Sequence, residues 1–136
     1  MNAESLLLLQ ALEGVVDQAF ADVQPCTFAP GVSLIEEGEA PDGLLLISSG
    51  VVQASWEGLS AQEGPMPGPG SVLGDISFLL GGVARASVTA REPVEALRFS
   101  QLSLHALMES NPAHGQRVFK ALAAINAQRL LTQTHP

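Results

Sequence analysis

The sequence predicts a mainly β protein: an antiparallel double-stranded β-roll, jelly-roll-like, with one helix before it and helices after it. Three observations support this prediction. Residues 4–20 carry apolar side chains at steps of three and four, which is the spacing of one helix face. Residues 23–99 change to short apolar runs separated by glycine, proline and acidic clusters, as is typical of short strands closed by turns. From residue 100 the helical spacing returns and continues to residue 131.

The chain has 136 residues, of which 46% are hydrophobic, and this is enough for one domain with its own core. We therefore expect a single domain over 1–136, with an N-terminal helix (1–22), a roll (23–99) and C-terminal helices (100–131). The net charge is -8, and no lysine or arginine precedes Arg85, whereas eleven of the fourteen acids do. Such an acidic surface repels nucleic acid and anionic lipid, so we expect no nucleic-acid partner.

Cysteine and histidine usage argues against catalysis and metal binding. Cys26 is the single cysteine, which excludes an internal disulfide and a zinc site built from cysteines. The three histidines (His105, His114 and His135) all follow the predicted roll, so no strand histidine can hold a metal. No nucleophile motif surrounds Cys26, and we expect neither enzyme activity nor a cofactor.

No apolar run approaches the roughly twenty residues that a membrane span needs. The short apolar run at residues 6–9 lacks the basic leader of a signal peptide. We therefore expect a cytoplasmic protein without direct membrane insertion.

The first predicted element is the helix over residues 4–20, and Ser5 or Asn2 is placed to cap its first turn. Its apolar stripe consists of Leu6, Leu9, Leu12, Val16 and Phe20, flanked by Leu8, Val15 and Ala19. An amphipathic helix of this kind packs on a sheet or on a partner.

Turn formers then divide residues 23–99 into short segments. The expected strands are 31–35, 44–47, 51–56, 72–73, 86–89 and 94–99. Ser48-Ser49-Gly50 predicts a tight hairpin turn between the second and third of these strands. Residues 36–43 are expected to form a loop, as are residues 57–70, which contain three prolines and four glycines.

After the roll, Ser100 is a suitable N-cap for a helix to Met108, and Asn111-Pro112 predicts a break followed by a second helix. This second helix, over residues 113–131, carries Val118, Leu122 and Ile125 on one face, with Phe119, Ala123 and Leu130 beside it. Core packing and a helix-mediated homodimer both fit this wide apolar face.

The most informative stretch lies between the strands at 72–73 and 86–89. Gly74 and Asp75 precede a short apolar run, the Gly81-Gly82 breaker and Arg85, and a strand-forming Ser-Val-Thr segment follows. A one-turn helix here directs free backbone N–H groups outward, Gly74 permits close approach, and Arg85 supplies a positive charge. This combination makes an anion cradle with a carboxylate beside it, which suits a phosphate attached to a sugar.

The stretch resembles the phosphate-binding cassette of cyclic nucleotide-binding domains, the family of the catabolite activator and the protein kinase A regulatory subunit. The family pattern reads Gly-Glu, a small apolar turn of helix, Gly, often Pro, then Arg-Ala-Ala-Thr or Arg-Ser-Ala-Ser, then Val. The chain aligns with it from residue 74 to residue 90 without a gap. It departs from the pattern at Asp75 in place of glutamate, at Val83 in place of proline, and at Ala84 in place of arginine, with Arg85 one position later.

The spacing upstream resembles the family a second time. The matching residues are Phe28, Gly31, Gly38-Glu39, Pro41-Asp42, Leu44-Leu45 and Gly50-Val51. The resemblance covers residues 28–99 and implies the eight-stranded antiparallel roll of the cyclic nucleotide-binding fold, with the C-terminal helices behind it.

In the family, the glutamate binds the ribose hydroxyl and the arginine binds the cyclic phosphate. The resemblance therefore implies a cassette over residues 74–87 whose ligand-binding residues are Gly74, Asp75, Ile76, Ser77, Arg85, Ala86 and Ser87. Three of them have an alternative role that the sequence leaves open. Asp75 is suited to cap the short helix at 76–80, Arg85 to pair on the surface with Glu36 or Asp42, and Ser87 to be an ordinary polar strand residue.

The resemblance implies a regulatory domain that senses a cyclic nucleotide, cAMP or cGMP, and relays binding through its C-terminal helices. A second hypothesis, favoured by Ala84, is a degenerate domain that binds no cyclic nucleotide and serves protein association or binds another small anion. A cupin-type enzyme is a third hypothesis, which the histidine positions argue against. No helix-turn-helix segment follows the last helix, so we expect a sensory module that acts with, or belongs to, a larger protein such as a transporter, channel or kinase.

Overall fold

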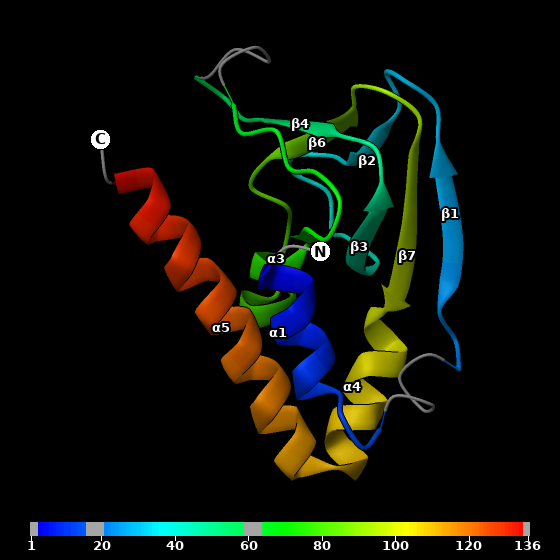
Figure 1. Ribbon diagram of the computed structural model, residues 1–136, viewed down its shortest axis with the longest axis vertical. Coiled ribbons are helices and arrows are strands. Elements are labelled where there is room, and N and C mark those ends of the chain that lie inside the picture. The colour runs from blue at the N-terminus through cyan, green and yellow to red at the C-terminus, as the bar shows by residue number, and fades with distance from the viewer. Residues whose placement is uncertain (1–2, 16–20, 59–63, 135–136) are drawn as a thin grey trace.

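The computed structural model describes residues 3–15, 21–58 and 64–134 of the chain. The described residues form two sheets, with the helices gathered beside them (Figure 1). One sheet has the strand order β1-β7-β3-β5 and the other β2-β6-β4, and every pairing is antiparallel. The predicted mainly β, antiparallel roll with flanking helices is therefore confirmed.

The elements follow the predicted order, except that the strand at residues 24–28 was not among those predicted. The larger sheet contains β1 (Gln24–Phe28), β3 (Gly43–Ser49), β5 (Val72–Leu73) and β7 (Val94–Ser100). The smaller sheet contains β2 (Ser33–Ile35), β4 (Val52–Ser55) and β6 (Ser87–Ala90). The helices are α1 (Ala3–Ala11), α3 (Asp75–Leu80), α4 (Gln101–Ser110) and α5 (Pro112–Thr134).

The turn at Gly50 joins two sheets, so the hairpin predicted at residues 48–50 is wrong. β3 pairs with β5 and β7, whereas β4, which follows the turn, pairs with β6. Gly50 has a φ of 91°, and a Cβ at this position would lie 2.4 Å from the carbonyl oxygen of Pro93. The turn requires glycine for both reasons, but it transfers the chain from one layer of the roll to the other.

The described residues form seven strands where the resemblance implies eight. The backbone N–H groups of Val52 and Ala54 donate to the carbonyl oxygens of Pro67 (3.0 Å) and Pro65 (2.9 Å). These prolines have no N–H with which to return a bond, so the segment runs along β4 without forming a ladder of its own. The loop predicted over 57–70 agrees with its described part, and residues 59–63 lie outside the described residues.

Helix α1 ends at Ala11, so it is shorter than the helix predicted over residues 4–20. Its buried face runs through Ser5 and Leu8 to Leu12 just beyond it, whereas Leu6, expected on the apolar stripe, is 50% exposed. Ser5 lies inside the helix and does not cap it. The remaining residues of that prediction (Asn2, Val16, Ala19 and Phe20) lie outside the described residues.

The C-terminal helices agree with the prediction. The Ser100 hydroxyl accepts a hydrogen bond from the Ser103 amide (3.3 Å) and caps α4. After the break before Pro112, α5 runs for 23 residues along one side of the molecule, with α1 beside it (Figure 1). Val118, Leu122 and Ile125 are buried in one core cluster with the apolar residues of α1. Core packing therefore accounts for these three residues, whereas Phe119, Ala123 and Leu130, predicted beside them, are exposed.

Candidate functional site

The cassette, residues 74–87, begins with a glycine that the backbone requires. Gly74 has a φ of 83°, and a Cβ on it would lie 2.7 Å from the carbonyl oxygen of Gly43 at the start of β3. α3 starts at the next residue, so the close packing of Gly74 on β3 fixes the point at which the helix leaves the sheet. Gly81 and Gly82, also at positive φ, end the helix in open space.

A cavity of about 640 Å³ lies against the cassette. Its other walls come from the two sheets, from the proline-rich segment at residues 65–67 and from the C-terminal half of α5, through Asn126, Arg129 and Leu130. Its volume is within the usual range for small-molecule sites. Six of the seven predicted site residues line the cavity: Gly74, Asp75, Ile76, Ser77, Arg85 and Ala86.

Ser87, the seventh predicted residue, does not line this cavity. Its hydroxyl accepts a hydrogen bond from the Glu37 amide (2.9 Å) and so ties the end of the cassette to the loop after β2. The Ser77 hydroxyl is also used within the chain, because it donates to the carbonyl oxygen of Val83 (3.2 Å).

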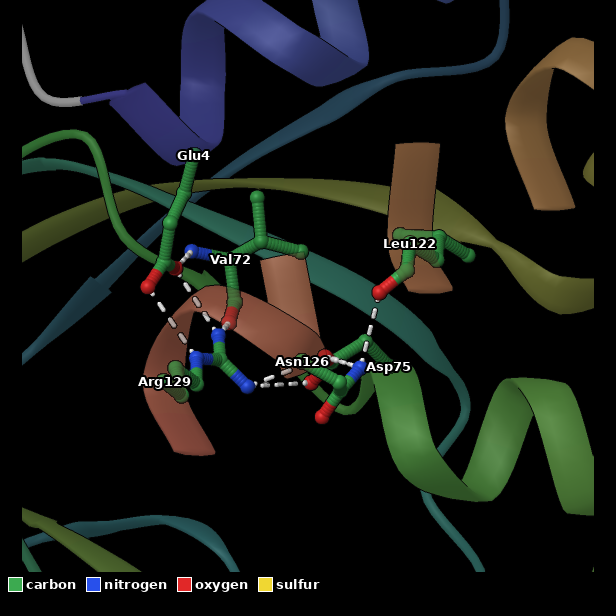
Figure 2. A network of polar contacts seen from close by, with 6 residues as sticks. All are labelled: Glu4, Val72, Asp75, Leu122, Asn126 and Arg129. Atoms are coloured by element: carbon green, nitrogen blue, oxygen red, sulfur yellow. Dashed lines mark hydrogen bonds and ion pairs between the residues drawn. The ribbon is translucent and has the colours of Figure 1, made fainter. Parts of the chain in front are cut away.

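Asp75 is buried, with 5% of its side chain exposed, and it is held by α5 (Figure 2). Nη1 of Arg129 donates to both carboxylate oxygens, at 3.1 Å to Oδ1 and 2.9 Å to Oδ2. Nδ2 of Asn126 donates to Oδ2 at 2.7 Å. The alternative that Asp75 caps the cassette helix is wrong, because Gly74 is the N-cap residue and no side chain caps that helix.

Arg129 binds a second acid as well as Asp75. Its Nε and Nη2 donate to the two carboxylate oxygens of Glu4 (3.0 and 2.8 Å), and Nη2 also donates to the carbonyl oxygen of Val72 (2.5 Å). Burial lowers the pKa of Arg129, but the hydrogen bond with Glu4 and the charges of Asp75 and Glu4 outweigh it, so the net pKa shift is upward. The guanidinium is therefore a permanent cation that joins α5, α1 and the cassette.

The prediction from sequence missed Glu4, Asn126 and Arg129. A signal for two of them was present on α5, since Asn126 follows Leu122 by four residues and Arg129 follows Ile125 by four. Each polar residue therefore continues the buried face of the helix, where it requires a partner. Nothing local identifies that partner, because Arg129 is 54 positions from Asp75 and 125 from Glu4.

The other end of the cassette, with Ala84 and Arg85, is called the cation end, and it is not bound by α5 as Asp75 is. Ala84, at the position where the family has arginine, is buried and lines the cavity. Its N–H donates to the Glu39 carbonyl oxygen (2.8 Å), and its own carbonyl oxygen accepts from the Gly38 amide (2.9 Å). Arg85 also lines the cavity but is exposed, and it forms no ion pair with any described residue, so the alternative pairing with Glu36 or Asp42 is absent.

The histidines of the described residues have packing roles. The ring of His105 stacks on Phe78 with centroids 4.9 Å apart, and Nε2 of His114 lies 3.1 Å from the carbonyl oxygen of Glu13. Within residues 3–15, 21–58 and 64–134, no three histidine, cysteine or acidic residues gather as metal ligands. No helix in this part of the chain has the length and apolar character needed to cross a bilayer.

Comparisons with known proteins agree with this geometry. A family model described as "Cyclic nucleotide-binding domain" matches residues 25–111. No curated protein sequence matches the chain.

Among solved structures, the catabolite activator protein of Thermus thermophilus is 27% identical, with a TM-score of 0.70, and the match covers 90% of this chain and 59% of that one. The N-terminal domain of a transcriptional regulator from Streptomyces coelicolor is 22% identical, with a TM-score of 0.71 and coverages of 96% and 92%. The C-linker/CNBHD of zELK channels, crystallized in the presence of cAMP, is 21% identical, with a TM-score of 0.75 and coverages of 91% and 64%. The chain thus spans less than two thirds of the activator and of the channel segment.

Proposed function

Since the chain belongs to the cyclic nucleotide-binding domain family, we propose that it is a regulatory domain that binds a cyclic nucleotide, cAMP or cGMP, in the cavity beside the cassette. One observation carries the proposal: both ends of the cassette and the C-terminal half of α5 line the same cavity of about 640 Å³. A ligand there contacts the cassette and α5 at once, so its binding biases the position of the C-terminal helices.

Each part of a cyclic nucleotide has a counterpart in this cavity. Arg85 lines the wall without an ion pair to a described residue, so its guanidinium is available to the cyclic phosphate. Asp75, ten residues earlier and on the same wall, is the acceptor for a ribose hydroxyl. The apolar side chains of Val72, Val88 and Leu130 line the cavity and provide contact area for the base.

The proposal is tested by calorimetric titration of the chain with cAMP and with cGMP. We expect saturable heat with at least one of them, and Arg85→Ala should weaken that affinity by at least about tenfold, the effect of losing one charged hydrogen bond. Arg117→Ala is the matched control, because Arg117 is exposed on α5 and does not line the cavity. Neither heat nor a thermal shift at millimolar nucleotide would contradict the proposal.

A second candidate function is favoured by the positions of two residues. Ala84 supplies no charge where the family has arginine, and the oxygens of Asp75 already accept three hydrogen bonds from α5. In this candidate the domain keeps the fold, binds no cyclic nucleotide, and serves protein association or binds another small anion. Its signature is a chain that gives no heat with either nucleotide, both as wild type and as the Ala84→Arg variant.

A further inference from the structure

Arg129 joins elements from both ends of the chain at the edge of the cavity. Figure 2 shows its guanidinium between Glu4 of α1, Val72 of β5 and Asp75 of α3. The carboxylate of Glu4 also accepts a hydrogen bond from the Val72 amide (2.9 Å), so α1 is bound to β5 through both the backbone and the guanidinium. One side chain of α5 therefore contacts α1, β5 and the cassette together.

All three nitrogens of the Arg129 guanidinium donate to acceptors within the protein. An arginine side chain carries five N–H donors. In Arg129, Nη1 is directed at Asp75, Nε at Glu4, and Nη2 at Glu4 and Val72. With two carboxylates around one guanidinium, the group also has a surplus negative charge, which disfavours a phosphate. Arg129 therefore serves contacts within the protein, although it lines the cavity.

Those internal contacts cover the acid that the proposed function assigns to the ligand. Only 5% of the Asp75 side chain is exposed, and its three hydrogen bonds all come from Arg129 and Asn126 of α5. Because so little of the carboxylate is exposed, a ligand hydroxyl gains access to it when α5 moves away from Asp75. A ligand hydroxyl at this position would therefore compete with α5 for the oxygens of Asp75.

We propose that Arg129 is an internal latch that competes with the ligand for Asp75 and that, through Glu4, couples the N-terminal helix α1 to the same event. In the ligand-free domain the latch holds α1 and α5 on the cassette. When a ligand hydroxyl displaces Arg129 from Asp75, the guanidinium reorients, and its paired contacts with Glu4 and Val72 are lost with it. This inference rests on the proposed function and adds a second output, since α1 is released together with α5.

The two helices are suited to move together because they share one core. Leu8 and Leu12, in and just after α1, are fully buried in the same cluster as Val118 and Leu122 of α5. Separating the helices from each other would expose these side chains, whereas tilting them as a pair keeps the contacts between α1 and α5. The cluster around Arg129 is the polar attachment of that pair to the cassette.

The test uses the double variant Glu4→Gln/Arg129→Gln, which removes one acid and one base and leaves an amide oxygen at position 4 to accept from Val72. Its matched control is Glu13→Gln/Arg117→Gln, which makes the same charge change at exposed sites, in the turn after α1 and on α5. Both are titrated with cAMP and cGMP, and their amide hydrogen exchange is measured without ligand. Arg129→Lys, which keeps the positive charge but cannot bind a carboxylate through two nitrogens, is the milder second variant.

We expect the double variant to bind the nucleotide about tenfold more tightly than wild type. In the variant the ligand hydroxyl no longer has to displace Arg129 from Asp75, so more of the protein is in the binding-competent state. Its exchange should rise in α1 and in the C-terminal half of α5 together, whereas the control should match wild type in both measurements. The Arg129→Lys variant should change in the same direction by less.

Three results would overturn the inference. If the folded variants bind with equal or weaker affinity while wild type binds, there is no competition, and the proposed function stands without the latch. If exchange rises in α5 but not in α1, the coupling through Glu4 is wrong. If wild type and all variants fail to bind either nucleotide, the proposed function fails and the competition fails with it.

Discussion

The two ends of the cassette are held in opposite ways. At the Asp75 end, a buried carboxylate accepts three hydrogen bonds from α5. At the other end, Ala84 and Ser87 are tied to the loop after β2, and Arg85 between them is exposed and without an ion pair to a described residue. The acid end is therefore held by the helices, whereas the guanidinium at the other end lines the cavity without an ion pair to a described residue.

The largest effect expected from this difference is on stability. Arg129→Ala leaves two acids without their shared cation, which typically costs 3–5 kcal/mol for a buried pair. Because 28% of the Arg129 side chain is exposed, we expect the lower end, about 3 kcal/mol, in urea unfolding. Arg85→Ala, at the other end, should change the unfolding free energy by less than about 0.5 kcal/mol. An equal loss of unfolding free energy in Arg129→Ala and Arg85→Ala would contradict the difference between the two ends of the cassette.

Gly74→Ala tests whether the acid end also depends on close backbone packing. Alanine at positive φ costs about 1–3 kcal/mol, and here its Cβ would also lie 2.7 Å from the Gly43 carbonyl oxygen. Gly82→Ala is the matched control, because its φ is 89° and nothing lies within 4 Å of a Cβ there. We expect a larger fall in unfolding free energy for Gly74→Ala. A loss no greater than that of the control would show that the contact with β3 is not required.

Ala84→Arg tests whether a phosphate binds at the cation end of the cassette. Ala84 lines the cavity, so an arginine there adds a second positive charge near the phosphate position. One charged hydrogen bond contributes about 1.5–3 kcal/mol, so calorimetry should show cAMP or cGMP affinity at least about tenfold higher. Unchanged affinity in a folded variant would show that no phosphate lies near this position.

The sequence was sufficient for those parts of the molecule that local chemistry controls. The Ser100 cap, the break before Pro112 and the buried face of α5 were predicted and confirmed, because each depends on neighbouring residues. Gly50 was predicted to turn the chain, but a glycine turn has the same local pattern whether the next strand pairs with the previous one or changes sheet. Pairing over long distances decides between these outcomes.

The end of the N-terminal helix and the partners of Asp75 could not be predicted from the sequence either. Residues 6–9 are four consecutive leucines, so the periodicity could not determine which of them face the core, and Gly14 ends the helical segment early. Asp75 was predicted as a ligand-binding residue and lines the cavity, but its partners Asn126 and Arg129 come from α5, and Arg129 in turn binds Glu4 near the other end of the chain. No spacing rule relates residues so far apart, so the occupation of this carboxylate could be learned only from the structure.

The most direct test of ligand binding coupled to the helices follows the Nε–H signal of Arg129 by NMR while cAMP or cGMP is added. In the ligand-free chain this group donates to Glu4 at 3.0 Å. We predict that its signal shifts along one binding curve with the amide signals of residues 74–77 and 84–86. Cassette signals that saturate while the Arg129 signal stays in place would contradict the latch, and no shift in either at millimolar nucleotide would contradict binding itself.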